Sequence, residues 1–277
     1  MTPVRPIRPE LAGSLVDARL QVHHAAQFGT ALGISCLEHQ PDDSHTNLGW
    51  DDTLGALVSR PVATENGSIA VGVRLQDLSI VAVVDGAMAS ATPLHGMTIA
   101  DTMEAVRSIV AARGLDPARY TLNRHYEIPR HRVDDGGTFD TSATAAFIEL
   151  DTWYRTAARE LEHVTRQNRG ASEVRTWPHH FDIATLIEVG RDRFTGAGLS
   201  PGDDSYSEPY FYVNATPQPA LARVGAPLAG GGVWHTREWI GAVLPGSRLT
   251  SVPAAQQDQV RAFLDSAIAA CRALVGG

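Results

Sequence analysis

The sequence predicts an α+β protein in which one or more mostly antiparallel sheets pack against about four main helices. Two observations support this class. Apolar residues recur at helical spacing in four segments, and the stretches between them hold short β-rich runs bounded by turn-forming residues. No low-complexity linker divides the 277 residues. We therefore expect a single domain, 1–277, with 1–135 and 136–277 as candidate related sub-halves.

The helices are predicted from apolar stripes and capping residues. The second helix begins at Thr98 as N-cap and is closed by Gly114. The third begins near 140–142 and ends before Gly170, and the fourth has Pro253 near its first turn. The first is expected to end within 29–33 and to carry the stripe Leu11, Leu15, Ala18, Val22 and Ala25.

The strands are predicted from short β-rich runs. Segments 56–63 and 69–84 are joined by Asn66-Gly67, a strong hairpin signal because both residues tolerate positive φ. Alternation around Val71 and Val73 predicts a strand with one face toward water. A further short strand is expected at 240–244.

Segment 120–133 is expected to form a strand followed by a turn. His125, Glu127 and His131 would then lie on one side of an extended chain, which makes them a secondary metal candidate. An exposed edge strand would show the same pattern. The loop 41–49, with His45 and two carboxylates, is interpreted as a solvated connection because Asp, Ser and Asn form turns for their own reasons.

Composition limits the classes of function. The net charge of −8 and the pI near 5.7 argue against a nucleic-acid partner. Every basic residue is Arg, so chemistry that requires Lys is excluded. Neither a signal peptide nor a bilayer-spanning segment is expected, and we predict a cytoplasmic protein. Cys36 and Cys271 stand in apolar surroundings, which favours reduced, buried thiols over a disulfide.

The stretch Trp177-Pro-His-His-Phe-Asp182 gathers the most promising polar residues. If Pro178 opens a strand, His180 and Asp182 share one face while His179 and Phe181 turn toward the core. The pair would offer one nitrogen and one oxygen ligand to a divalent ion.

Three later segments add candidates for the same site. Glu208, Tyr210 and Tyr212 share one face of a second strand, and the two polar faces meet if the strands are neighbours. Asp203 and Asp204 lie in the Pro- and Gly-rich segment 198–206. Three roles are open for them: ligands of an ion, acid–base groups, or turn formers. The third segment is Trp234-His235, in which His235 would add a second imidazole and Trp234 an aromatic contact to a ligand.

Three functions are consistent with this constellation. The first is a small-molecule hydrolase or acid–base enzyme in which His180, Asp182, Glu208 and His235 bind a divalent metal ion or carry protons. The second is a protein that binds a small molecule without turnover, using Tyr210, Tyr212, Asp203, Asp204 and Trp234. The third is a satisfied polar network that only fixes the fold. The helical zinc motif, the nucleophile elbow and the dinucleotide fingerprint do not occur.

Four motifs carry a resemblance to a known family. They are Trp-Pro-His-His-Phe-Asp-Ile-Ala (177–184), Gly-Leu-Ser-Pro-Gly-Asp-Asp (198–204), Glu-Pro-Tyr-Phe-Tyr-Val (208–213) and Gly-Ala-Val-Leu-Pro (241–245). In these the chain resembles a bacterial family catalogued only as a domain of unknown function, and weaker likeness extends over most of the sequence. The resemblance implies one fold for the whole chain and supplies no activity, cofactor or catalytic residue.

Overall fold

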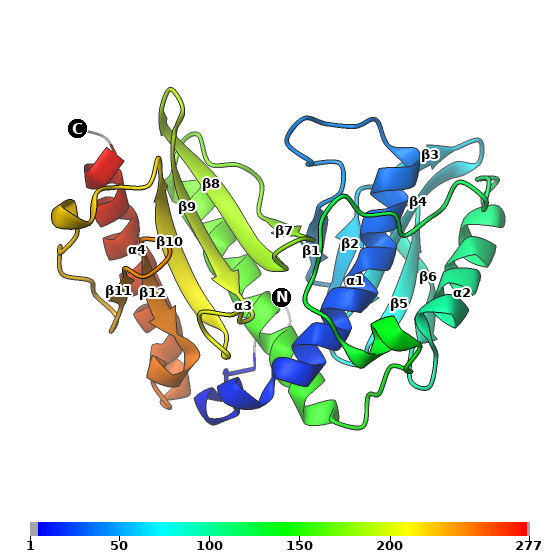
Figure 1. Ribbon diagram of the computed structural model, residues 1–277, viewed down its shortest axis with the longest axis horizontal. Coiled ribbons are helices and arrows are strands. Elements are labelled where there is room, and N and C mark those ends of the chain that lie inside the picture. The colour runs from blue at the N-terminus through cyan, green and yellow to red at the C-terminus, as the bar shows by residue number, and fades with distance from the viewer. Residues whose placement is uncertain (1–4, 276–277) are drawn as a thin grey trace. The chain divides into compact units, whose positions relative to one another are not determined.

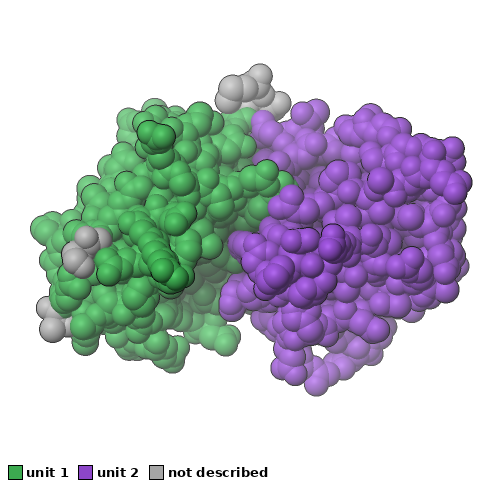
Figure 2. All heavy atoms as spheres, turned by 90° about the horizontal axis from the view of Figure 1, so that it is seen from above, with its two compact units in different colours: residues 1–16, 152–175, 182–277 green, residues 17–151, 176–181 purple. Residues whose placement is uncertain are grey.

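The computed structural model describes residues 5–275 and confirms the α+β class. Over these residues the strand pairs are antiparallel. The chain divides into two compact units: residues 1–16, 152–175 and 182–277 form unit 1, and residues 17–151 and 176–181 form unit 2 (Figure 2). The main helices are α1 (Val16–Cys36), α2 (Ile99–Ala111), α3 (Thr144–Gln167) and α4 (Pro253–Val275).

Unit 2 is built on a meander of short strands that α1 crosses (Figure 1). The strand order is β1-β2-β4-β5-β6, with β3 paired to β4. A hairpin is confirmed here, but its turn lies one residue earlier than predicted: Thr64 pairs with Gly67, and of the two predicted turn residues only Gly67 has positive φ, at 111°. The strands are β1 (Leu48–Asp51), β2 (Ala56–Ser59), β3 (Val62–Thr64), β4 (Gly67–Arg74), β5 (Ser79–Val84) and β6 (Ala87–Pro93).

Helix α1 extends beyond its predicted end, because Gly29 and Gly33 are sites of close packing against other parts of unit 2. A Cβ atom on Gly29 would lie 2.7 Å from the carbonyl oxygen of Val71 in β4, and one on Gly33 would collide with the backbone of His45. The two glycines are one turn apart and let the helix approach the strands closely. Their conformation is helical, so the prediction that they end the helix was wrong.

Two strand predictions in unit 2 were also wrong. Strand β4 is buried at five consecutive residues, 69–73, so neither of its faces lies open to water. Segment 120–133 forms no strand; it is irregular apart from the start of a short 3₁₀ helix, Arg132–Asp135. Two of the alternating residues pair with different carboxylates, His125 with Asp43 and His131 with Asp17.

Unit 1 holds a second antiparallel meander, in the order β8-β9-β10-β12-β11. Helix α4 packs against β9, β10 and β12, and the buried Phe263 and Leu264 belong to its apolar stripe. Each such side chain contributes roughly 1.5–3 kcal/mol on burial. The strands are β8 (Asp182–Gly190), β9 (Arg193–Ser200), β10 (Tyr210–Thr216), β11 (Val233–His235) and β12 (Gly241–Pro245).

The remaining strand, β7 (Arg175–Trp177), immediately precedes the polar stretch that the sequence singles out. Its Thr176 pairs with Leu48 of β1. Residues 178–181 form a turn between β7 and β8. The turn at 178–181 sets the directions in which the side chains of residues 177–182 point.

Candidate functional site

His180 lies in a turn and not on a strand, which corrects the predicted geometry of residues 177–182. The backbone N–H of Phe181 donates to the carbonyl of Trp177 at 2.7 Å, and Phe181 has a left-handed backbone with φ 60°. Strand β8 begins only at Asp182. Alternation therefore cannot place His180 beside Asp182. His180 is exposed, and its ring centroid lies 4.3 Å from that of His179.

Asp182 instead pairs with Tyr212, one of the predicted ligand-binding residues. The Tyr212 hydroxyl donates to a carboxylate oxygen of Asp182. Strands β8 and β10 are not neighbours; both pair with β9, where Gly198 faces Ala184 on one side and Tyr212 on the other. Burial, followed by the nearby Asp182 charge, raises the pKa of Tyr212 well above its usual range. Tyr212 therefore stays a hydrogen-bond donor.

Tyr210 makes an analogous bond to Asp203. Its hydroxyl donates to one carboxylate oxygen of Asp203, and burial raises the pKa of this tyrosine as well. The other carboxylate oxygen accepts from the backbone N–H groups of Ser205 and Tyr206, at 2.8 and 3.0 Å. Asp203 is thus an Asx-turn residue that also positions Tyr210. Asp204 beside it is exposed.

His235 is held by two hydrogen bonds and an aromatic stack. Its Nε2 faces the carbonyl oxygen of Arg237, which can only accept, so this nitrogen carries the proton. Its Nδ1 then accepts from the Tyr206 hydroxyl at 3.0 Å, and the Trp239 ring stacks on the imidazole at 4.4 Å. Both ring nitrogens are used, which leaves no lone pair for a metal. The neighbouring Trp234 donates its indole N–H to a backbone carbonyl.

Glu208 acts as a cap. Its two carboxylate oxygens accept from the backbone N–H of Ser247 and from the Ser247 hydroxyl, the latter at 2.8 Å. Ser247 lies in the 3₁₀ helix Gly246–Arg248 that follows β12. An acceptor at such a helix start satisfies a backbone donor that would otherwise be unpaired.

Of the predicted set His180, Asp182, Glu208 and His235, the three residues of unit 1 are therefore not brought together as ligands. Of these residues, Asp182, Glu208 and His235 each have a separate partner within unit 1. Two tyrosine–aspartate pairs and one tyrosine–histidine pair form the hydrogen bonds among these side chains.

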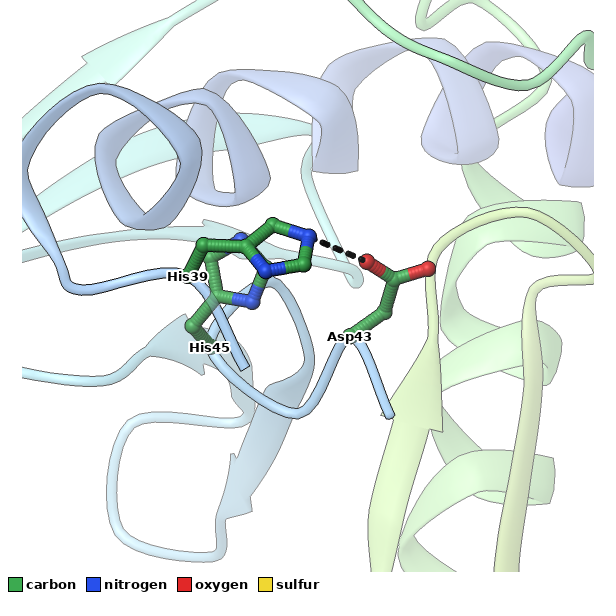
Figure 3. Close-up of side chains that lie close together, drawn as sticks. All are labelled: His39, Asp43 and His45. Atoms are coloured by element: carbon green, nitrogen blue, oxygen red, sulfur yellow. Dashed lines mark ion pairs between the residues drawn. The ribbon is translucent and has the colours of Figure 1, made fainter. Parts of the chain in front are cut away.

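A different group of residues brings metal-ligand atoms together. His39, Asp43 and His45 lie in the loop between α1 and β1, and one donor atom of each lies within 4.8 Å of the others (Figure 3). It is the one set of three such donors among the residues that the structure describes. The His39 and His45 ring centroids are 5.0 Å apart, and the carboxylate of Asp43 points toward the rings.

The loop conformation explains why these side chains converge. Asp43 has a left-handed backbone with φ 58°, and its backbone N–H and C=O bond to Gln40 and Thr46 at 3.0 and 2.9 Å. The tight turn reverses the chain, so the residues before and after it return to the same place. The Gln40 N–H also donates to His45 Nδ1, over 3.3 Å.

Histidines from two other segments of unit 2 surround this loop. His125 Nε2 lies 2.9 Å from Asp43 Oδ2, while His39 Nε2 lies 4.0 Å from Asp43 Oδ1. The charge of Asp43 also reaches His179, whose pKa is lowered overall, mainly by burial. Burial, followed by repulsion from His39, lowers the pKa of His45. His45 and His179 are therefore neutral at neutral pH, the form that binds metals.

The sequence contained only a partial signal for this group. The pattern His-x₃-Asp-x-His at 39–45 lies in a stretch of turn formers and matches no helical or finger motif. His125 was considered together with Glu127 and His131, yet His131 Nε2 pairs with Asp17 Oδ1 at 3.0 Å. Only the tertiary fold brings His125 to Asp43, because the two are far apart in the chain.

Comparison of the chain with family models, with curated proteins and with solved structures finds no match. The resemblance to a bacterial family of unknown function stays a prediction. None of the helices within residues 5–275 combines the length and the apolar character that crossing a bilayer requires.

Proposed function

We propose that the protein is a metal-dependent hydrolase of small molecules, with His39, Asp43 and His45 as ligands of a divalent transition metal ion. The observation that carries the proposal is the convergence of two imidazoles and one carboxylate within 4.8 Å. Bound donors in a tetrahedral site lie roughly 3.3 Å apart, given metal–ligand bonds of about 2.0 Å. Small side-chain rotations would therefore close the site, and His45 would exchange its long bond from Gln40 for the metal.

The charges around the three ligands suit this role. Nitrogen and oxygen donors together favour zinc or a neighbouring first-row ion over calcium or magnesium. His125 binds one oxygen of Asp43 at 2.9 Å, which orients the carboxylate and leaves its other oxygen toward His39. His125 is thus proposed as a positioning residue.

Three protein ligands leave one coordination position for water, the arrangement of catalytic zinc sites. The ion would lower the pKa of that water and so supply a nucleophile at neutral pH. His39 has an exposed side chain, so a substrate can approach from solvent. The Asp43 charge acts on the pKa of His179, so the two side chains are near each other. His179 is the candidate for a proton-transferring group.

The test is the metal content of purified protein after dialysis against zinc, measured by elemental analysis, together with ester hydrolysis measured on p-nitrophenyl acetate. We expect about one zinc per chain, hydrolysis that a chelator abolishes and zinc restores, and loss of both in the double variant His45→Ala/Asp43→Ala. Stoichiometric zinc without hydrolysis would leave a metal-binding protein and refute the enzyme proposal. Unchanged zinc content in the double variant would refute the site.

Two exposed histidines of unit 2 provide a matched comparison. His39 and His95 have side chains that are 75% and 62% exposed, so replacing either should leave the fold intact. His39→Ala should weaken zinc binding by about tenfold or more, and His95→Ala should not. His235→Asn is a second control, since both of its ring nitrogens have partners.

The compartment and the partners remain part of the proposal. Cys36 and Cys271 are free thiols, which supports a reducing compartment such as the cytoplasm. The net charge of −8 supports a small-molecule substrate over nucleic acid. Isolation of the native protein in complex with RNA or DNA would contradict this part.

A further inference from the structure

Unit 2 contains a cavity of about 670 Å³ that is separate from the residues of the metal group. It is lined by α1, by the first turns of α2 and by segment 122–136, and it is open to solvent on one side. Its size is that of a pocket for a small organic molecule. Half of its lining is apolar, provided by Phe28, Ile99, Ala100, Met103, Leu122 and Val133.

Most polar groups of the lining already have partners. Gln27 accepts from the Tyr126 hydroxyl at 2.9 Å and donates to the Pro178 carbonyl at 3.0 Å. His24 donates from Nε2 to the Pro129 carbonyl, and its Nδ1 lies 3.3 Å from the Asp134 carboxylate. These groups shape the cavity without offering a free bonding site.

The backbone donors at the start of α2 also have partners, which the helix's own residues Thr98 and Asp101 provide. The Thr98 hydroxyl accepts from the Asp101 N–H at 3.1 Å, and the Asp101 carboxylate accepts from the Thr98 N–H at 2.9 Å. A carboxylate thus already occupies the positive end of the helix dipole. The helix start therefore does not define the ligand.

Arg124 differs from the other polar groups of the lining. It is half-buried, and within residues 5–275 its guanidinium has neither a hydrogen bond nor an ion pair. Asp134, the carboxylate of the same lining, is used by His24 and by the backbone N–H of His131 at 3.0 Å. A guanidinium presents five donors in a planar fork that matches a carboxylate. Arg124 is thus a ready anion-binding group at the edge of an apolar space.

We propose that this cavity binds an amphipathic monocarboxylic acid, whose carboxylate pairs with Arg124 and whose apolar body contacts Phe28, Met103 and Val133. One guanidinium provides a single positive charge, and the nearby Asp134 opposes a second negative charge on the ligand. A monoanion therefore fits better than a phosphate ester. This site is independent of the metal proposal and uses none of its three ligands.

The test is isothermal titration calorimetry with octanoate and with octan-1-ol, in the presence of a chelator so that no metal holds the carboxylate. We expect saturable binding of octanoate to the wild type. Arg124→Gln should weaken octanoate binding by about ten- to a hundredfold and leave octanol binding unchanged, since a charge-assisted hydrogen bond is lost. Arg191→Gln, at a fully exposed arginine, is the matched control.

A second variant keeps the inference testable if Arg124→Gln does not fold. Ala100 lines the cavity from an exposed position of α2, so Ala100→Trp would fill the space without disturbing the core. It should weaken octanoate and octanol binding together. Equal octanoate affinity in the wild type and in Arg124→Gln, or no saturable octanoate binding to the wild type, would overturn the proposal. His45→Ala should retain octanoate binding, which separates this site from the metal site.

Discussion

The Tyr212 hydroxyl bonds to the Asp182 carboxylate across the full width of an intervening strand. The two residues belong to β10 and β8, and β9 lies between them. The ring passes over Gly198, where a Cβ atom would lie 2.7 Å from both Cζ and Oη of Tyr212. The absence of a side chain at this position is therefore a condition for the pair.

Gly198→Ala should lower the free energy of unfolding by about 1–3 kcal/mol. The added methyl group meets the ring of Tyr212 and also lies 2.8 Å from the backbone oxygen of Ile183, which cannot move aside easily. Urea denaturation measures the change. The control is Gly190→Ala, where the nearest atom is Arg193 Cδ at 3.6 Å. In a Tyr212→Ala background the Gly198→Ala change should cost less, and strict additivity would contradict the proposed contact.

The elements of the fold could be predicted where local signals determine them. The Thr98 cap and, with its turn one residue earlier, the hairpin near Asn66-Gly67 were confirmed because capping and positive φ depend on a few neighbouring residues. The end of α1 was predicted too early, since Gly29 and Gly33 were interpreted as the residues where the helix stops. Their packing against β4 and His45 is a tertiary effect.

The site was less predictable because it depends on strand order and on turns. Both tyrosine–aspartate pairs join residues that the sequence had identified. The pair of Tyr212 with Asp182 follows from the register of β8, β9 and β10, and the pair of Tyr210 with Asp203 depends on the turn at Asp203. His180 was misplaced because nothing before Asp182 shows that Phe181 adopts positive φ. Bulky residues such as Phe rarely adopt this left-handed backbone conformation.

The two thiols should differ sharply in reactivity. Cys271 is buried, and burial raises its pKa to about 12. Cys36 is half-buried and so more accessible; burial raises its pKa, and the nearby Arg119 charge opposes that rise. Because the thiolate is the reactive form, native protein should react with iodoacetamide at Cys36 first, and Cys271 should react only after unfolding. Peptide mass spectrometry gives the order, and labelling of Cys271 before Cys36 in native protein would contradict it.

Acid should destabilise unit 2 through His23. Burial lowers the pKa of His23 to about 3, and its Nε2 donates to the Pro178 carbonyl at 2.8 Å. The unfolded chain, with a pKa near 6.5, binds the proton more readily, so the His23 contribution is complete above pH 6.5 and decreases as the pH falls toward 3. The slope approaches about 1.4 kcal/mol per pH unit for this one group. Urea denaturation at several pH values measures it.

His23→Gln isolates that contribution. Glutamine places an amide N–H near the position of Nε2 but does not titrate, so stability should depend less steeply on pH than in the wild type. At neutral pH the variant should be less stable, because the stacking of His23 on Phe181, at 4.7 Å between ring centroids, is lost. The control is His163→Gln, at a half-exposed histidine of α3 that lies in unit 1 and so outside the surroundings of His23 in unit 2. An unchanged pH slope in His23→Gln would contradict the assignment.

The role of Glu208 can be separated from metal binding by one substitution. If it is a cap, Glu208→Ala should lower the free energy of unfolding by about 1 kcal/mol, because the Ser247 N–H and hydroxyl lose their acceptor. Ser247→Ala should reduce the effect of Glu208→Ala, since one of the two hydrogen bonds is then already absent. Zinc content should be unaffected by either change, because both carboxylate oxygens of Glu208 bond to Ser247 and Glu208 is not one of the proposed ligands. Loss of zinc in a folded Glu208→Ala protein would restore Glu208 as a ligand and exclude a purely structural role.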